Sequence, residues 1–357
     1  MENLKGLILS GGAGTRLRPI THTSAKQLVP VANKPVLFYG IEALVEAGVT
    51  EIGIVIAPET GVEIRAAVGD GSALGAKVTY LPQSEPLGLA HAVLTAEDFL
   101  DQSPFVMYLG DNLLRDGITE LVAAFREHGP EALIMLTQVL HPEQYGVAEL
   151  DGERIVRLIE KPKDPPSDLA LVGVYMFRPS VFAAAKAIEP SPRGELEITD
   201  TIQRLIDDGR AVEYHRVKGW WKDTGQLEDM LAANRLVLED IEPHIGGELI
   251  DCNVEGRVVV EAGAVLERTT VRGPAVIGAG ARVTDAYIGP YTAIGEDCEV
   301  AGSEVEHSIL LRGARVRNLA SRMEASLLGR NVSLSRSDGL PKTIRMIVGD
   351  NSELNLP

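Results

Sequence analysis

The chain has 357 residues, a length that suggests two domains. Hydrophobic residues make up 45% and charged residues 24%, which is typical of a globular protein with a sizeable core and unlike disordered, collagenous or coiled-coil chains. Its 34 Lys and Arg against 51 Asp and Glu give a formal net charge of -17. A surface this acidic repels phosphate groups, so we expect neither a nucleic-acid partner nor an anionic membrane partner.

Cysteine usage and the N-terminus indicate the compartment. The two cysteines, Cys252 and Cys298, are too few for a disulfide framework or a zinc cluster. The N-terminal segment carries Glu2, and Ser10 interrupts its apolar run, so we expect no secretory signal. No run of about 18 apolar residues occurs, which predicts no membrane span. These features together predict a reduced, cytoplasmic protein.

The first third of the chain alternates short apolar segments with helical patterns. Continuous apolar runs at residues 7–9, 52–57 and 105–109 predict strands that are buried on both faces. Apolar residues with helical spacing predict helices over residues 35–47 and 88–100. This alternation is typical of βαβ units, so we expect an α/β domain with a Rossmann-like, mixed and mostly parallel sheet.

A more β-rich stretch follows and completes this domain. Four strands are expected, at residues 132–139, 147–150, 155–159 and 170–177. Three helices are expected, at residues 179–188, 199–208 and 226–240. In the second helix, Thr199 or Asp200 is the expected N-cap and Gly209 the C-terminal stop. The first domain therefore covers residues 1–240.

The pattern changes after Pro243, where helical periodicity stops. Aliphatic residues recur every six positions and, after one dropped residue, resume the same period: Val259, Val265, Val271, Ile277, Val283, Ile288, Ile294 and Val300. This period is the mark of a hexapeptide β-helix, in which aliphatic side chains fill a narrow core and glycines allow the corners. A chance run of valines in a β-sandwich fits the pattern less well. We expect a β-helix domain over residues 245–357, with a tail after Ser337.

The glycine-rich segment at residues 9–19, directly after the first strand, is suited to binding phosphate. Its glycines let backbone N–H groups approach phosphate oxygens closely. Residues 5–34 contain only cations among their charged side chains, a local excess that a polyphosphate site needs. A Walker A loop would need Gly-Lys-Ser/Thr, and a dinucleotide fingerprint would need glycine at Leu17. A plain glycine-rich connection remains the alternative for this segment alone.

Further motifs add a definite family resemblance. They are residues 11–19 (GGAGTRLRP) and 26–31 (KQLVPV), Gln83, residues 88–90 (GLA), 110–112 (GDN), 145–147 (YGV), 160–162 (EKP), 192–200 (PRGELEITD) and 223–225 (DTG). Over about residues 4–240 the chain resembles the sugar-1-phosphate nucleotidylyltransferases, most closely those that transfer thymidylate to glucose 1-phosphate. The hexapeptide region is similar to the long form of actinobacterial deoxysugar pathways, which implies a left-handed β-helix.

The resemblance implies in-line transfer from dTTP to glucose 1-phosphate, giving dTDP-glucose and pyrophosphate with Mg²⁺ as cofactor. Such an enzyme must hold two anions together and stabilise charge at the α-phosphate. We expect Arg16 on the triphosphate and Lys26 on the α-phosphate. Asp111 follows a predicted strand, where a carboxylate suits Mg²⁺, and Asp223 is the second ligand by resemblance. A turn cap is the alternative for a lone Asp.

The remaining site residues are divided between nucleotide and sugar. Lys161 is expected on the sugar phosphate and Glu160 on the sugar hydroxyls, with an ordinary exposed charged pair as the alternative. Gln83 offers a donor and an acceptor to the imide edge of thymine or uracil, and Gly88 leaves room for the base. The resemblance adds Leu9, Gly11, Gly12, Gly14, Thr15 and Gln27 on the nucleotide, and Asn112, Gly146 and Val172 around the sugar.

Two positions depart from the shorter members of the family. Leu87 stands where they carry an acid, and His91 where they carry a glutamine. The β-helix also replaces the helical C-terminus that shapes their feedback site, so feedback inhibition stays open.

Three other interpretations stay open. UTP or another triphosphate is an alternative donor, because a methyl group gives little discrimination. The β-helix is an alternative site of acyl transfer, for which His307 is the histidine within the repeats. A regulatory binding module is the third. Because a short β-helix has open ends that are usually covered between subunits, we also expect a homo-oligomer.

Overall fold

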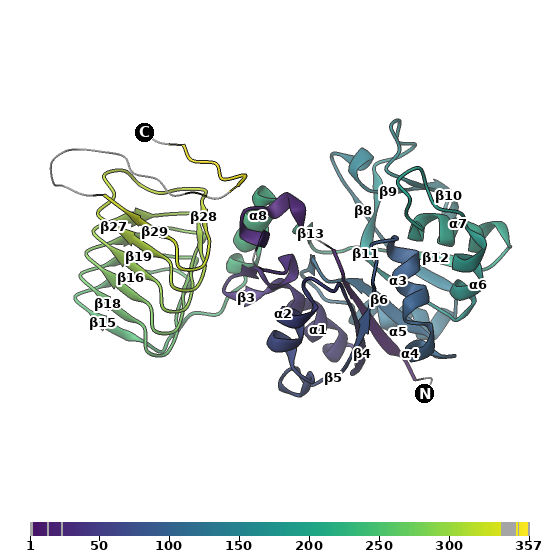
Figure 1. Ribbon diagram of the computed structural model, residues 1–357, viewed down its shortest axis with the longest axis horizontal. Coiled ribbons are helices and arrows are strands. Elements are labelled where there is room, and N and C mark those ends of the chain that lie inside the picture. Colours follow the sequence, from purple (N-terminus) through teal and green to yellow (C-terminus); the bar gives the residue numbers. More distant parts are fainter. Residues whose placement is uncertain (1–2, 13, 23, 337–347, 349, 356–357) are drawn as a thin grey trace. The chain divides into compact units, whose positions relative to one another are not determined.

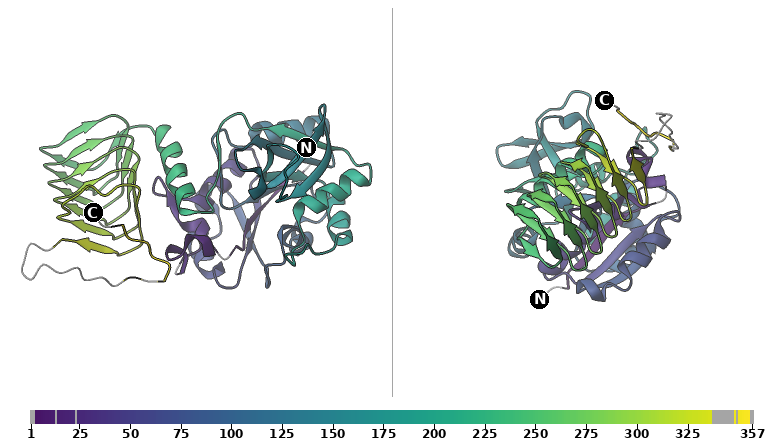
Figure 2. Two further views of the ribbon diagram at one scale, coloured as in Figure 1. Left: turned by 90° about the horizontal axis from the view of Figure 1, so that it is seen from above. Right: turned by 90° about the vertical axis from the view of Figure 1, so that its left-hand side faces the viewer.

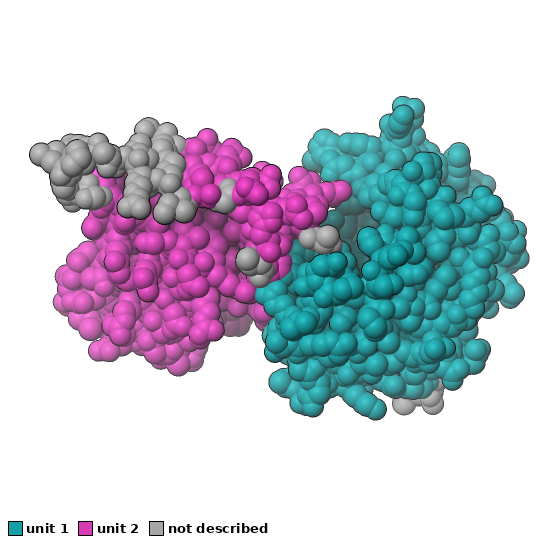
Figure 3. Space-filling model, in the orientation of Figure 1, with its two compact units in different colours: residues 1–13, 25–28, 36–223 teal, residues 14–24, 29–35, 224–357 magenta. Residues whose placement is uncertain are grey.

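The computed structural model describes residues 3–12, 14–22, 24–336, 348 and 350–355 (Figure 1). The chain forms two compact units (Figure 3). Unit 1 comprises residues 1–13, 25–28 and 36–223, and unit 2 comprises residues 14–24, 29–35 and 224–357. Two short N-terminal segments therefore belong with the C-terminal third of the chain. The tail expected after Ser337 lies largely outside the described residues.

Unit 1 is built on a nine-stranded mixed sheet with the strand order β10-β9-β11-β6-β1-β4-β5, in which β8 also pairs with β11 and β12 pairs with β8. The strands are β1 (Lys5–Ser10), β4 (Glu51–Ile56), β5 (Lys77–Pro82), β6 (Phe105–Leu109), β8 (Ala132–Gln138), β9 (Gly146–Asp151), β10 (Arg154–Glu160), β11 (Leu169–Phe177) and β12 (Val212–Arg216). Strands β5, β4, β1 and β6 are parallel, and β11 is antiparallel to β6. The predicted α/β class is confirmed.

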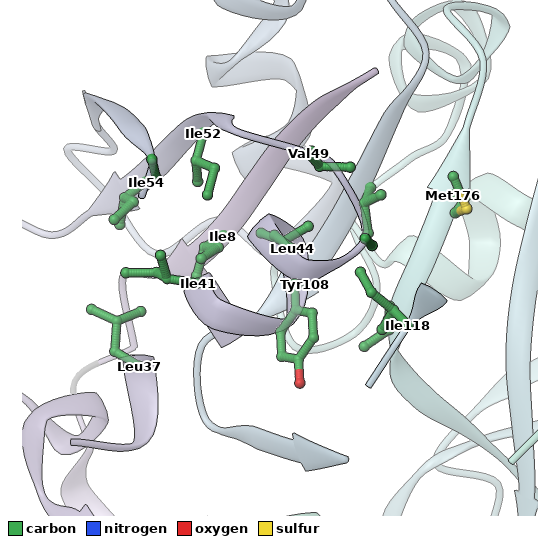
Figure 4. Close-up of a cluster of buried hydrophobic side chains, with 14 of the residues drawn as sticks. Ile8, Leu37, Ile41, Leu44, Val49, Ile52, Ile54, Tyr108, Ile118 and Met176 are labelled. Atoms are coloured by element: carbon green, nitrogen blue, oxygen red, sulfur yellow. The ribbon is translucent and has the colours of Figure 1, made fainter. Parts of the chain in front are cut away.

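Helices cover both faces of this sheet. Helices α1 (Val36–Glu46), α2 (Gly61–Val68) and α5 (Thr119–His128) contribute to one buried cluster, part of which Figure 4 shows. Helices α3 (Leu89–Thr95), α6 (Ser180–Ala187) and α7 (Ile198–Asp207) contribute to a second. Within β1, Ile8 belongs to the first cluster, whereas Leu7 and Leu9 belong to the second. Burial on both faces explains why this strand has a continuous apolar run.

Tertiary contacts move two of the predicted helix boundaries. The helix expected over residues 88–100 is divided at Ala96 into α3 and α4 (Glu97–Leu100). The N-cap of α7 is Glu197, so neither Thr199 nor Asp200 is the cap, and that prediction is wrong. The N–H of Leu196 donates to the carbonyl of Leu87 at 2.8 Å, which keeps the backbone extended up to the start of this helix. Gly209 follows the helix with a φ of 72°, as expected of a stop.

Unit 2 contains the β-helix, whose parallel strands stack in three sheets (Figure 2). The first sheet has β14 (His244–Ile245), β17 (Val258–Val260), β20 (Ala275–Ile277), β23 (Thr292–Ile294), β26 (Ile309–Leu310) and β28 (Leu327–Leu328). The second has β15 (Glu248–Ile250), β18 (Val265–Glu267), β21 (Arg282–Thr284), β24 (Glu299–Ala301), β27 (Arg315–Arg317) and β29 (Ser333–Ser335). The third has β16 (Asn253–Glu255), β19 (Thr270–Arg272), β22 (Tyr287–Ile288) and β25 (Glu304–Val305).

Two core positions in the second coil, on β17 and β18, differ from the prediction by one residue. Val260 and Leu266 are fully buried, whereas Val259 and Val265 are partly exposed. The predicted positions from Val271 onward are buried. Strand pairing explains the difference: Val260 lies beside Ile277, and Ile277 beside Ile294. Each of these coils is therefore one residue shorter than three hexapeptides, so the dropped residue recurs instead of occurring once.

A polar network in unit 2 connects the β-helix with α8 (Leu227–Glu239) and with the hairpin of β2 (Pro30–Val31) and β3 (Lys34–Pro35). The buried Asn234 side chain accepts a hydrogen bond from the N–H of Ala32 and donates one to the carbonyl of Tyr291, both at 2.9 Å. Asn33 donates from Nδ2 to the carbonyl of Ile294 at 2.7 Å. The hairpin is thus held by both α8 and the β-helix.

The remaining elements are short. They are η1 (Thr15–Leu17), η2 (Ile20–His22), η3 (Lys26–Leu28), η4 (Ser72–Leu74), η5 (Pro142–Gln144), β7 (Asn112–Leu114) and β13 (Trp221–Asp223). In the part of the chain that the structure describes, no helix is both long and apolar enough to cross a membrane.

Candidate active site

The centre of the candidate site is an ion pair at the carboxyl edge of the parallel strands. Lys26 lies on η3, and Asp111 lies in the turn between β6 and β7. The ammonium group of Lys26 donates to Oδ2 of Asp111, and the two side chains are 17% and 16% exposed. Burial by itself would raise the pKa of Asp111, but the Lys26 charge and hydrogen bonds from Lys26 and Asn112 lower it below its ordinary value. The carboxylate therefore stays ionised.

Strand pairing brings the second predicted carboxylate to the same place. Strand β13 is antiparallel to β7, and Asp223 lies opposite Asn112, the neighbour of Asp111 in the chain. The Asn112 side chain donates to Oδ1 of Asp111 at 3.0 Å and accepts from Nε1 of Trp221 at 2.6 Å. It also accepts from the N–H of Gly173 at 3.2 Å. Asn112, which we expected around the sugar, thus orients Asp111.

Several predicted nucleotide contacts lie around the end of β1. A Cβ atom added to Gly11 would lie 3.2 Å from Oε1 of Gln83, and one added to Gly12 would lie 3.7 Å from Cε of Lys26. The side chain of Gln27 is buried, and its Oε1 has no hydrogen-bond partner within the described residues. Leu9 is buried in the second core cluster, so it can offer only its backbone to a ligand.

The segment that carries Arg16 belongs to unit 2. Gly14 has a φ of 61° and precedes η1, on which Thr15 and Arg16 are exposed and Leu17 is buried. The predicted roles of Gly14, Thr15 and Arg16 on the triphosphate stay predictions.

The loop expected to face the base is built by two motifs that are far apart in the sequence. Gly88 has a φ of 103°, and a Cβ atom there would lie 2.4 Å from the carbonyl oxygen of Leu196, so only glycine fits. The N–H of Ala90 donates to the same carbonyl at 3.0 Å. The side-chain nitrogen of Gln83 lies 2.8 Å from Nδ1 of His91 and 3.4 Å from the carbonyl oxygen of Gly88. These contacts hold Gln83 beside Gly88, and the expected role of both residues at the base stays a prediction.

The expected sugar-phosphate residues meet where β9 and β10 pair. Gly146 lies opposite Glu160 in the strand register. Oε1 of Glu160 lies 3.6 Å from Nζ of Lys161 and 3.3 Å from Nη2 of Arg193. Thr199 donates to Oε2 of Glu160 at 3.2 Å. The structure therefore brings Gly146, Glu160 and Lys161 together in one charged cluster.

Arg193 and Thr199 belong to this cluster, but the sequence predicted a role in the site for neither of them. Both lie in the motif at residues 192–200, which was the signal for them. Glu197 accepts from Arg193 at 2.8 Å, and burial, aided by the Glu197 charge, raises the pKa of Glu160 against the effects of Lys161 and Arg193. Val172 is fully buried in the first core cluster, so its role at the sugar stays a prediction.

A lysine–carboxylate pair, a second carboxylate on the adjoining strand and glycine-rich turns are the groups that phosphoryl chemistry uses. The nucleotidyl transferase family matches residues 5–240, and the chain belongs to that family. It is 55% identical to a glucose-1-phosphate thymidylyltransferase of Streptomyces griseus over 356 residues, with 99% of each chain covered.

Two further proteins support this assignment. A glucose-1-phosphate thymidylyltransferase of Streptomyces antibioticus is 52% identical over 356 residues, with 99% of each chain covered. A crystal structure from Bacillus anthracis, provisionally assigned as a glucose-1-phosphate thymidylyltransferase and containing sucrose, has 36% identity and a TM-score of 0.64. The similarity covers 68% of this chain and 98% of that one. The predicted family resemblance is confirmed.

Proposed function

We propose that the protein transfers thymidylate from dTTP to glucose 1-phosphate and releases pyrophosphate. The observation that carries this proposal is the Lys26–Asp111 pair with Asp223 on the adjoining strand. Gln83 and Gly88 supply a base-reading loop, and Lys161 with Arg193 supplies cations for a sugar phosphate. Similarity over nearly the whole chain to relatives named for this reaction supports the same conclusion.

The transfer needs positioned charges more than proton chemistry. A phosphate oxygen of glucose 1-phosphate forms a bond to the α-phosphorus, the bond from that phosphorus to the bridging oxygen breaks, and pyrophosphate leaves with the electron pair. Lys26 neutralises the charge that develops at the α-phosphate, and Arg16 binds the triphosphate. Lys161 holds the attacking phosphate in line, and Glu160 accepts hydrogen bonds from sugar hydroxyls.

Asp111 and Asp223 would hold Mg²⁺, and their carboxylate oxygens are the ligands that this hard cation prefers. Among the described residues, no group of three or more His, Cys, Asp or Glu side chains is arranged to hold a metal. Two carboxylates completed by phosphate oxygens and waters fit the usual way in which Mg²⁺ is bound with nucleotides. The metal would supply further neutralisation of phosphate charge.

The nucleotide is the ligand that we assign to Gly11, Gly12 and Gln27. An unpaired buried acceptor such as Oε1 of Gln27 costs about 1–3 kcal/mol, so a donor on a bound nucleotide would stabilise the complex. Because thymine differs from uracil by one methyl group, we also expect the protein to use UTP.

Release of pyrophosphate is the measurement that tests this proposal. Mixing the protein with Mg²⁺, dTTP and glucose 1-phosphate is expected to give dTDP-glucose and pyrophosphate in equal amounts, and UTP is expected to react more slowly. If no triphosphate gives any pyrophosphate, a regulatory binding module would be favoured. Consumption of an acyl donor would favour a β-helix acyltransferase, although the partly buried ring of His307 packs edge-on against Tyr291 at a centroid distance of 6.2 Å.

We also propose that the protein works in the cytoplasm, since both cysteines are free thiols.

We propose residues 1–240 as the catalytic domain and residues 245–357 as a domain for assembly into a homo-oligomer. The first coil of the β-helix exposes Ile245, Leu249 and Ile250, which are 45%, 38% and 39% exposed, and an open β-edge of this kind is usually covered.

Deleting residues 245–357 is expected to lower the oligomeric order and to reduce, but not abolish, activity per soluble subunit. The deletion removes the carbonyls of Tyr291 and Ile294, which accept hydrogen bonds from Asn234 and Asn33. The hairpin that follows Lys26 in the chain would then lose part of its anchoring. Light scattering and activity normalised to soluble monomer test both effects.

A monomeric full-length protein would exclude the assembly role. Complete inactivity of a well-folded truncated chain would show instead that the β-helix is needed to form the active site.

A further inference from the structure

A histidine that no step of the transfer uses lies against the base-reading loop. Gln83 follows β5, is 8% exposed, and is fixed by a hydrogen bond of 2.9 Å from its N–H to the carbonyl of Ile56. Its side-chain nitrogen lies 2.8 Å from Nδ1 of His91, which is on the first turn of α3. The same nitrogen lies 3.4 Å from the carbonyl oxygen of Gly88. Two groups, the His91 ring and the Gly88 carbonyl, thus converge on the nitrogen end of a single amide.

The Gly88 carbonyl decides which end of the amide faces this cluster. A carbonyl oxygen only accepts hydrogen bonds, so the NH₂ group of Gln83 must face it, since the reversed amide would set two acceptors against each other. The carbonyl cannot easily move, because it accepts from the N–H of Ala92 at 3.2 Å and Gly88 is packed against Leu196. With the NH₂ group in place, Nδ1 of His91 must be the acceptor. The imidazole is then neutral, with its proton on Nε2.

We propose that His91 is a positioning residue for base selection, which holds the Gln83 amide with its oxygen toward the base. The two amide hydrogens are engaged by Gly88 and His91, and the oxygen lies on the side of Gly11, at the end of β1. This inference rests on the proposed function, because it takes the bound base to be thymine or uracil. It adds a specificity determinant on the first turn of α3.

The fixed oxygen gives a defined selectivity. Thymine and uracil carry a hydrogen on N3, which an amide oxygen accepts. Cytosine presents an unprotonated N3, which meets the same oxygen as a second acceptor. A site whose polar groups are left unpaired by the wrong ligand rejects it strongly. Gln83 therefore selects the imide bases as long as Gly88 and His91 together prevent its amide from turning over.

The test compares His91→Leu with His91→Gln. Leucine cannot accept a hydrogen bond, whereas the amide oxygen of glutamine can replace Nδ1. His91→Leu is expected to raise the KM for dTTP and to lower the preference for dTTP over dCTP, each about tenfold. The KM for glucose 1-phosphate should stay within about twofold, and His91→Gln should restore both nucleotide properties. Thr95→Val is the matched control, since the Thr95 hydroxyl donates to the backbone carbonyl of His91 at 2.9 Å.

Two further measurements make the test decisive. In a Gln83→Leu background, His91→Leu should add no further change, because a residue that acts through Gln83 has nothing left to position. Calorimetric binding of dTTP and dCTP without the sugar phosphate tests the selection even if no product forms, so failure of the proposed function is recognised separately. An unchanged preference in His91→Leu, an equal rise of both KM values, or failure of His91→Gln to restore selectivity would each overturn the proposal.

Discussion

Replacing Asp111 by Asn lowers turnover by about a hundredfold to a thousandfold, while the fold is retained. The substitution preserves the size of the side chain but removes the charge that pairs with Lys26 and that would hold Mg²⁺. Asp223→Asn is expected to act in the same way, because Asp223 lies opposite Asn112 on the adjoining strand. Steady-state kcat over a range of Mg²⁺ concentrations measures the effect, and circular dichroism confirms the fold.

Asp116→Asn is the matched control, since Asp116 is an exposed carboxylate just beyond the other end of β7. Near-normal activity of the Asp111 or the Asp223 variant at ordinary Mg²⁺ concentrations would show that this carboxylate does not hold the metal.

The pH dependence of stability gives a second readout for Asp111. Because the folded-state pKa of Asp111 is lowered, its stabilising contribution is present above the unfolded-state pKa of about 3.9 and is lost as the pH falls further. The stability difference between wild type and Asp111→Asn should therefore narrow in acid.

Replacing Lys161 by Ala raises the KM for glucose 1-phosphate by about tenfold or more and leaves the KM for dTTP within about twofold. The reason is that Lys161, together with Glu160 and Arg193, lies in the cluster beside Gly146, whereas the loop that we propose for the base contains Gln83 and Gly88. The lost contact therefore concerns one substrate. Initial rates with each substrate varied at saturation of the other separate the two constants.

Lys163→Ala serves as the control, because Lys163 is an exposed lysine two residues away. An equal rise of both KM values in Lys161→Ala would contradict its assignment to the sugar phosphate. Lys161→Met provides a second variant, which removes the charge but keeps the bulk of the side chain. Agreement of the two variants would show that the loss of charge causes the effect.

The sequence identified the central strands and the candidate chemistry because both leave local signals. Strands β1, β4 and β6 are buried on both faces, so each has a continuous apolar run. Every residue of edge strand β5 and of strand β12 is at least partly exposed. Neither strand has such an apolar run, so the sequence pattern missed both. The repeat of the β-helix is also local, because each coil places its core residues at a short and regular spacing along the chain.

The sequence by itself determined the family, the α/β class, the β-helix and the residue types Lys26, Asp111, Lys161 and Asp223. Only the tertiary structure decided which distant segments meet around these residues. It paired Trp221 with Asn112 across 109 residues, set Gly88 against Leu196, and joined His91 to the amide of Gln83. It also shifted two core positions in the second coil of the β-helix by one residue and placed residues 14–24 and 29–35 in unit 2. These features depend on contacts between segments that are distant in the chain, and no local hydrophobic or turn pattern records them.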